Sequence, residues 1–208
     1  MITIIDRTNI YLYQRQMEQV WRLRHEIFVE EYGWGDIARD DQREIDQFDD
    51  EHAVHFLCHI DGELVGYSRM LPTTGPHLLR DVYPHLCEEE RPEGSDVWEW
   101  TRYCVRKDHR GRGRKLGPVA NALLTAIVAW GIEGGLRSMV IQMNPLWMLV
   151  LVQLLFRPRP LGIIHEMDGA DVLCVDCSFD ARTLERLREM QPDVTPVTAH
   201  VRSDALAE

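Results

Sequence analysis

Apolar residues recur with distinct periods along the first third of the chain. Residues 2–6 alternate in the manner of a strand, and from 9 to 28 apolar residues return at helical spacing. Two strand-like runs follow at 53–60 and 63–70, and the pair Asp61-Gly62 between them is typical of a tight hairpin turn. The pattern therefore predicts a strand, a helix and an antiparallel hairpin.

The rest of the chain alternates strand-like and helix-like runs. Residues 97–105 are rich in aromatic and β-branched side chains, which favour a strand. The apolar face of 116–130 predicts a helix that ends at Gly131. The remaining predicted elements are a strand at 138–143, a buried helix at 147–156, a strand at 170–179 and a short helix at 182–190.

This succession predicts the fold class α/β (α+β), as a single-domain three-layer αβα sandwich with a mixed central sheet. One domain is expected over residues 1–190, because 208 residues can bury one core well and are too few for two. Residues 191–208 contain prolines and are expected to form a loose C-terminal tail.

Composition narrows the possible partners. The net charge of −11 argues against nucleic acid, which needs a broad basic surface to neutralise its phosphates. The longest apolar run, 145–156, falls short of the roughly 20 residues that a bilayer span takes, so no membrane partner is expected. Five cysteines without disulfide-scaffold spacing, and an N-terminus without a secretory pattern, indicate a reduced, cytoplasmic setting. No pattern determines an oligomeric state.

Residues 29–51 have no clean period and carry aromatic and many acidic side chains. A loop of this length is unusual inside a compact domain and is often functional. Taken singly, its residues and those around it could be solvated charges or core aromatics. Together they could hold a cation beside its own carboxylate, because aromatic faces attract sulfonium-like cations and arginine binds carboxylate in a fixed fork. The candidates are Arg24, Phe28, Trp34, Asp46, Asp49, Arg69, Glu99 and Arg102.

The spacing of these candidates resembles that of the LuxI-type acyl-homoserine lactone synthases, the autoinducer synthase family. The matching pattern is Arg24-x3-Phe28-x5-Trp34, Asp46-x2-Asp49, Arg69 and Glu99-x2-Arg102. The resemblance runs from about residue 10 to about residue 106, and more loosely to about residue 180. One departure is Tyr83, where the family usually has Phe; the ring is kept and a hydroxyl is added. The family's fold resembles that of the GNAT acetyltransferases.

The resemblance implies synthesis of an N-acyl-L-homoserine lactone quorum-sensing signal from S-adenosyl-L-methionine and an acyl thioester, with methylthioadenosine released. Both molecules would be substrates, and no cofactor or metal is implied. By analogy Glu99 is the base that deprotonates the α-ammonium group before it attacks the thioester. Arg69 and Arg102 would orient the carboxylates, whereas Asp46 and Asp49 would lie near the amine or hold the arginines in place. The adenosyl and sulfonium part would be bound by Arg24, Phe28 and Trp34.

Glu99 and Arg102 face opposite sides of a regular strand, because side chains alternate and the two are an odd number of residues apart. If both belong to one pocket, the strand must be interrupted, and bulges are common beside active sites. We therefore predict a β-bulge in the 97–105 strand, between Trp98 and Tyr103.

A basic stretch from Arg106 to Lys115 stands out on this acidic chain. Glycine-rich turns and helix N-termini bind anions, although most such charge runs are simply solvated. Arg110-Gly111-Arg112-Gly113 also resembles the acetyltransferase pyrophosphate loop, with Lys115 where a small residue is usual. The basic stretch could bind the acidic face of an acyl-carrier protein or the pyrophosphate of an acyl-CoA, and the loop pattern favours acyl-CoA. The residues assigned to the acyl donor here are Arg106, Lys107, Arg110, Arg112 and Arg114.

Four further residues are assigned to the acyl donor: Tyr83, Val105, Met143 and Trp147. Met- and Leu-rich segments such as the one around Trp147 are more often simply core. Cys174-x2-Cys177 has zinc-like spacing without a second pair, so no metal site is expected.

Two other functions remain open. One is a GNAT-type acyl-CoA N-acyltransferase that acts on another amine, which would explain 97–130 but give the acidic loop no purpose. The other is a non-catalytic module that binds an acyl donor.

Overall fold

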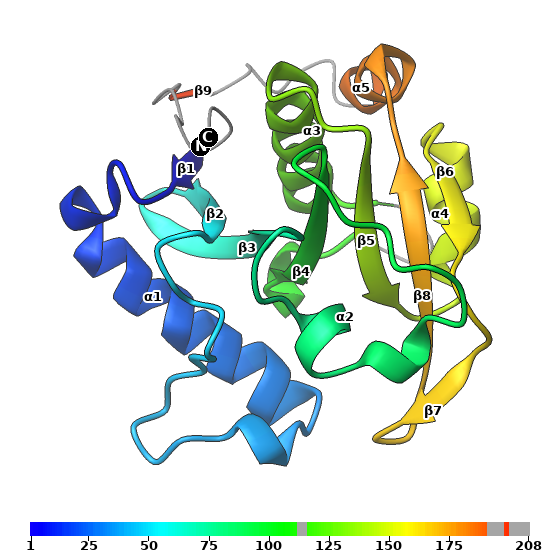
Figure 1. Cartoon of the computed structure of the whole chain (residues 1–208). Coiled ribbons are helices and arrows are strands. Elements are labelled where there is room, and N and C mark those ends of the chain that lie inside the picture. The colour runs from blue at the N-terminus through cyan, green and yellow to red at the C-terminus, as the bar shows by residue number, and fades with distance from the viewer. Residues whose placement is uncertain (112–115, 191–197, 200–208) are drawn as a thin grey trace. The chain divides into compact units, whose positions relative to one another are not determined.

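A computed structural model describes residues 1–111, 116–190 and 198–199. The chain divides into two compact units, which are described separately. The first contains Met1–Arg69, Arg102–Ala126 and the described residues 198–199, and the second contains Met70–Thr101 and the described residues from Ile127 to 190. Helices and strands alternate as in the predicted α/β class (Figure 1).

Strands of the first unit follow the predicted order. β1 (Ile2–Ile5) pairs antiparallel with β2 (Val54–Ile60) and in parallel with β9 (Thr198–Ala199), which lies within the expected tail. β2 turns into β3 (Glu63–Pro72) through Asp61 and Gly62, whose φ angles of 49° and 85° are both positive. A two-residue hairpin turn of type I′ requires this conformation at both positions.

The predicted 9–28 helix is confirmed but is divided into three segments. They are the 3-10 turn η1 (Ile10–Leu12), the helix α1 (Gln14–Arg24) and the π-helical segment η2 (His25–Glu31). α1 lies against the strands because Met17, Val20 and Leu23 form one buried face that packs with Ile5 of β1 and Leu57 of β2 (Figure 1). Single π-helical turns inside helices often accompany functional sites.

The strand order in the second unit is β6-β8-β5-β4. β4 (Val97–Val105) and β5 (Ser138–Met143) run parallel, whereas β8 (Ala170–Ser178) runs antiparallel to β5, so the sheet is mixed as predicted. The two edge strands β6 (Arg157–Pro160) and β7 (His165–Met167) both pair with β8 and were not predicted.

Helix α3 (Pro118–Glu133) continues past the predicted end at Gly131. That prediction was wrong because Gly131 serves packing and does not end the helix. A Cβ at this position would lie 2.8 Å from the ring of Phe179. The left-handed residue that follows the helix is Gly135, with φ 73°. The other short elements are η3 (Gly35–Ile37), α2 (Leu78–Asp81), η4 (Pro84–Leu86), η5 (Lys107–His109) and α5 (Ala181–Glu189).

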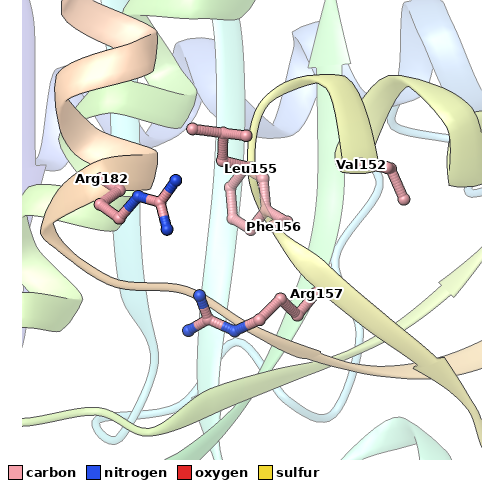
Figure 2. A pocket seen from close by; sticks show the side chains of 5 residues that line it. All are labelled: Val152, Leu155, Phe156, Arg157 and Arg182. Atoms are coloured by element: carbon pink, nitrogen blue, oxygen red, sulfur yellow. The ribbon is translucent and has the colours of Figure 1, made fainter.

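Helix α4 (Trp147–Gln153) contradicts the prediction of a buried helix over 147–156. Only Leu151 is buried within it, while Leu149 is 61% and Val152 is 51% exposed. Just beyond it, a cavity of about 260 Å³ is lined by Val152, Leu155, Phe156, Arg157 and Arg182 (Figure 2). None of these lining residues is a predicted site residue. Among the described residues no helix is long and apolar enough to cross a bilayer.

Candidate active site

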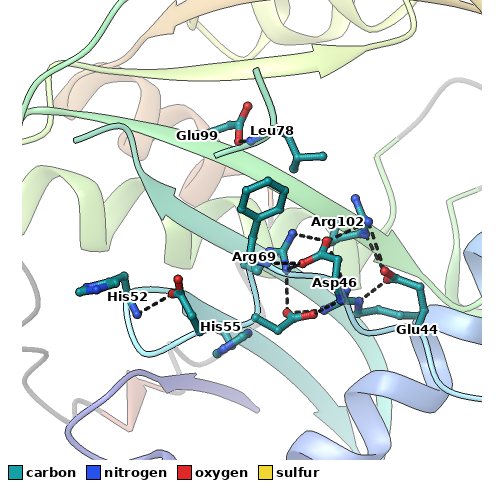
Figure 3. Close-up of polar contacts among 12 residues, drawn as sticks. Glu44, Asp46, His52, His55, Arg69, Leu78, Glu99 and Arg102 are labelled. Carbon is teal, nitrogen blue, oxygen red and sulfur yellow. Dashed lines mark hydrogen bonds and ion pairs between the residues drawn. The ribbon is translucent and has the colours of Figure 1, made fainter. Parts of the chain in front are cut away.

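Three arginines and three carboxylates of the first unit alternate in a closed ring of ion pairs, part of which is labelled in Figure 3. Arg69, on β3, binds both carboxylate oxygens of Asp46, at 2.6 and 2.8 Å. Its Nη1 also donates to Asp49 Oδ1, at 2.7 Å. The same Asp49 oxygen accepts a 2.6 Å hydrogen bond from Nη1 of Arg24, the last residue of α1. Asp46 and Asp49 are therefore paired with these arginines, and their predicted catalytic roles stay predictions.

Glu44 and Arg102 close the ring. Arg24 Nε donates to Glu44 Oε2 at 2.5 Å. Arg102 binds both oxygens of Glu44 at 3.1 Å, and its Nη2 donates to Asp46 Oδ2 at 2.9 Å. The backbone N–H of Glu44 donates to Trp21 O, which ties the acidic loop to α1. We call the six residues Arg24, Glu44, Arg102, Asp46, Arg69 and Asp49 the Arg–carboxylate ring.

The Arg–carboxylate ring is neutral in sum and almost fully removed from solvent. The side chains of Arg24, Arg69 and Glu44 are 0% exposed, and that of Arg102 is 10% exposed. Buried charges are tolerated only when they are paired and hydrogen-bonded. Burial alone would raise the pKa of Glu44, but its bonds to Arg24 and the charge of Arg102 lower that pKa to about 2. Burial opposes the same effect at Asp49, where Arg24 and Arg69 hold the pKa well below its usual range.

The depressed pKa of Glu44 predicts a loss of stability in acid. A carboxylate whose folded pKa lies below its ordinary value of 4.5 contributes stability above that pH and loses it as the pH falls toward about 2. The thermal midpoint should therefore fall steeply through this window. Glu44→Gln should have a lower midpoint at neutral pH and a shallower fall, measured by circular dichroism melts over the same range. An equally steep fall in the variant would show that Glu44 does not contribute.

Glu44 belongs to the same ring but was not among the predicted site residues. Charge balance gave no signal for it, because the three predicted arginines were already matched by Asp46, Asp49 and Glu99, and only the structure shows that Glu99 has other hydrogen-bond partners. Tyr67 was also missed. Its ring centroid lies 5.7 Å from Arg24 Cζ, and its hydroxyl is 2.7 Å from His55 Nδ1. Burial lowers the pKa of His55 to about 3, so this imidazole is neutral.

An aromatic pair borders the Arg–carboxylate ring at Arg102. Phe28 and Trp34 stack with centroids 5.0 Å apart and an interplanar angle of 17°. Arg102 Cζ lies 5.6 Å from the Phe28 centroid and 6.0 Å from that of Trp34. Phe28 is buried, whereas Trp34 is 37% exposed. The structure thus brings together the predicted residues Arg24, Phe28, Trp34, Asp46, Asp49, Arg69 and Arg102, with Glu44 added.

Arg102 interrupts the regular strand. Its φ of 52° lies in the left-handed region, within β4 and inside the predicted interval from Trp98 to Tyr103. A non-glycine residue rarely adopts this conformation, and a left-handed residue in a strand is a mark of a bulge. The break in alternation that the sequence predicted is confirmed. The bonds from Arg102 to Glu44 and Asp46 hold the strained residue in place.

Glu99 lies in the second unit and is fully buried. Its Oε2 accepts a hydrogen bond from Leu78 N and its Oε1 from Leu79 N, both at 2.7 Å (Figure 3). Gln142 Nε2 donates to Oε1 at 2.9 Å. Burial raises the pKa of Glu99, whereas His77 and these hydrogen bonds act to lower it. A carboxylate with a raised pKa is a better proton acceptor than an ordinary one.

The basic stretch is engaged in contacts within the first unit. Arg110 binds both carboxylate oxygens of Glu31 at 2.5 and 2.8 Å, and its Nε donates to the carbonyl of Val105. Arg106 pairs with Glu63 at 3.4 Å, and Lys107 is exposed. The expected Arg112 and Arg114 lie outside the described residues. Arg110 therefore holds the loop against η2, which the sequence analysis did not anticipate.

The other residues assigned to the acyl donor are distributed over both units. Val105 ends β4 and is buried in the first unit. In the second unit, Tyr83 packs against a core cluster that includes Leu79 and Leu86. Met143 ends β5 and is half-buried, and Trp147 begins α4 and is 43% exposed. Within the described part of the chain, no group of three or more His, Cys, Asp or Glu side chains could hold a metal ion.

Residues 9–159 match the family described as autoinducer synthase. The chain belongs to the autoinducer synthase family. It is 33% identical over 190 residues to an isovaleryl-homoserine lactone synthase of Bradyrhizobium diazoefficiens. The aligned residues cover 91% of this chain and 84% of that relative. Among solved structures it is similar to BjaI, a CoA-dependent acyl-homoserine lactone synthase with S-adenosylmethionine and isopentyl-CoA, at a TM-score of 0.91 and 32% identity. That comparison covers 100% of this chain and 97% of BjaI.

The predictions of family, fold and enzyme class are confirmed for this autoinducer synthase. A solved acyl-CoA N-acyltransferase from Pseudomonas aeruginosa shares the fold at a TM-score of 0.58 and 15% identity, covering 85% of this chain and 97% of that one. Of the three functions that the sequence left open, the family match selects the acyl-homoserine-lactone synthase, an acyltransferase.

Proposed function

We propose that this synthase makes an N-acyl-L-homoserine lactone from S-adenosyl-L-methionine and an acyl-CoA. The observation that carries the proposal is the buried Arg–carboxylate ring bordered by the Phe28–Trp34 pair. An aromatic pair with an arginine at its edge suits a substrate that carries both a sulfonium cation and a carboxylate. In this assignment Arg24, Phe28 and Trp34 bind the adenosyl and sulfonium part, and the ring orients the amino-acid part.

Glu99 is proposed as the base of the first step. It takes a proton from the α-ammonium group, and the freed amine attacks the acyl carbon of the thioester. A C–N bond forms and the C–S bond breaks, so that the thiol leaves with a proton. The raised pKa of Glu99 supports this role, because a carboxylate with a higher pKa is a stronger base toward the ammonium proton.

The second step is a substitution within the acylated intermediate. The carboxylate oxygen attacks the methylene carbon attached to sulfur, the C–S⁺ bond breaks, and methylthioadenosine leaves as a neutral thioether. No electrons are exchanged with an external group, so the proposed reaction needs no redox cofactor, and we propose that it uses the two substrates alone. The enzyme's contribution is to hold a folded conformer in which carboxylate and carbon are close.

CoA is the proposed form of the donor, although an acyl-carrier protein fits the same chemistry. The support is the similarity to a CoA-dependent synthase, together with Arg106 and Lys107 at the start of the basic stretch. A cytoplasmic location is also proposed. It is supported by the five free cysteines, four of which are buried.

The proposed function predicts methylthioadenosine release that depends on an acyl donor. The purified protein would be incubated with S-adenosylmethionine and a panel of straight-chain, branched and aromatic acyl-CoAs, isovaleryl-CoA among them, and with the matching acyl-carrier proteins. Methylthioadenosine and lactone would be quantified by mass spectrometry. Release with an acyl-CoA and not with the carrier-protein forms supports the proposal in full. Release with carrier proteins alone corrects the donor, and no release with any donor contradicts the function.

A further inference from the structure

His77 carries a buried ring nitrogen that nothing in the described structure satisfies. The residue is 0% exposed. Its Nδ1 lies 3.0 Å from the carbonyl oxygen of Gly75, and a carbonyl can only accept, so Nδ1 bears the hydrogen. In the neutral imidazole Nε2 is then a lone-pair acceptor, and it is buried without a hydrogen-bond partner among the described residues. Buried polar atoms are nearly always paired, and an exception beside a catalytic candidate calls for an explanation.

The imidazole is fixed next to the turn that holds Glu99. His77 is the residue immediately before α2, and its own N–H donates to Asp81 Oδ2 at 3.0 Å. The next two N–H groups along the chain, those of Leu78 and Leu79, hold the two oxygens of Glu99. When the imidazole of His77 is protonated, its charge lowers the pKa of Glu99 more than any hydrogen bond does, because the two groups lie close together. Two proton acceptors of the second unit are therefore neighbours, and both are held by hydrogen bonds.

Amide formation from an ammonium group requires that two protons leave the nitrogen, so two proton acceptors can take part. The nitrogen loses one proton before it attacks the thioester and a second after the new C–N bond has formed. Only one proton is needed by the departing thiolate. A single carboxylate must therefore release its first proton before it can take the second, unless another base stands beside it.

We propose that Nε2 of His77 is a second proton acceptor for the substrate's amino nitrogen and acts beside Glu99. The inference rests on the proposed function. Glu99 takes the proton of the α-ammonium group, and the amine attacks the acyl carbon. The proton that remains in excess on nitrogen passes to Nε2 and makes an imidazolium. The C–S bond then breaks, the thiolate takes the proton from the imidazolium, and Glu99 releases its own proton to water, which restores both residues.

Two substitutions separate the functions of the two ring nitrogens. His77→Asn can keep the hydrogen bond to the Gly75 carbonyl through its amide nitrogen but has no acceptor at the Nε2 position. His77→Gln can place an oxygen there that accepts a hydrogen bond but cannot take up a proton at neutral pH. Both variants should fold with a thermal midpoint close to the parent. Both should lower kcat by about a hundredfold, the lower end of what a positioned proton acceptor contributes, with little change in KM for S-adenosylmethionine.

A kcat within twofold of the parent in either folded variant would overturn the proposal, and so would a loss that appears only in KM. If neither variant folds, the parent protein labelled with ¹⁵N-histidine answers the question by NMR. The spectrum should show the Nδ1–H tautomer for His77 and an Nε2 resonance that moves when S-adenosylmethionine is added to saturation. A resonance that does not move overturns it. If the parent releases no methylthioadenosine with any donor, the proposed function has failed, whereas parent activity with unimpaired variants refutes His77 alone.

Discussion

Glu99→Gln is expected to lower the kcat of methylthioadenosine release by about two orders of magnitude or more, because a neutral amide cannot accept the ammonium proton. The variant also presents an amide N–H₂ to backbone N–H groups that now donate to a carboxylate. Its thermal midpoint must therefore be measured beside its activity. A folded variant with a kcat within tenfold of the parent would remove Glu99 from the role of base.

Gln142→Met provides a matched control for Glu99. It keeps the carboxylate and removes one hydrogen bond that stabilises its charged form. The pKa of Glu99 should rise, so the acid limb of the kcat–pH profile should move to higher pH while the plateau is largely retained. An acid limb that stays in place would mean that Glu99 does not set the profile.

Asp49→Asn is expected to destabilise the fold by about 3–5 kcal/mol, since breaking a buried ion pair leaves the partner charges uncompensated. Asp49 accepts hydrogen bonds from both Arg24 and Arg69, whose side chains are 0% exposed. Water therefore cannot replace the lost carboxylate as a partner for their charges. The free energy of unfolding would be measured by urea titration, with the slope checked for a change in two-state behaviour. A loss below about 1 kcal/mol would show that the Arg–carboxylate ring relaxes without strain.

Glu93→Gln is the control for Asp49→Asn. Its carboxylate pairs with Arg91 at 2.7 Å, a distance much like those in the Arg–carboxylate ring, but the two side chains are 44% and 30% exposed. Exposed ion pairs contribute at most about 1 kcal/mol, because water screens them and the side chains lose entropy on pairing. If both substitutions lower the free energy of unfolding by a similar amount, burial does not account for the stability that the Arg–carboxylate ring contributes.

The elements that depend on residues adjacent in the sequence were predictable. The hairpin follows from Asp61-Gly62, since both residues accept positive φ, and the β4 strand from its aromatic and β-branched composition. The edge strand β6 was missed because Pro158 and Pro160 interrupt the usual pattern, and a proline is tolerated only where no ladder N–H is required. Helix α4 was misjudged because an apolar run does not reveal which of its faces another element covers.

By itself, the sequence determined the family, the α/β class, the separate predicted site residues and the need for a break near Arg102. Only the tertiary structure decided how the charges pair. Glu44 meets Arg24 and Arg102, which are 20 and 58 residues away along the chain. Such a choice of partner depends on which side chains are buried together and must neutralise one another without water, and no local period records it. Only the tertiary structure likewise shows that Nε2 of His77, beside the turn that binds Glu99, has no hydrogen-bond partner among the described residues.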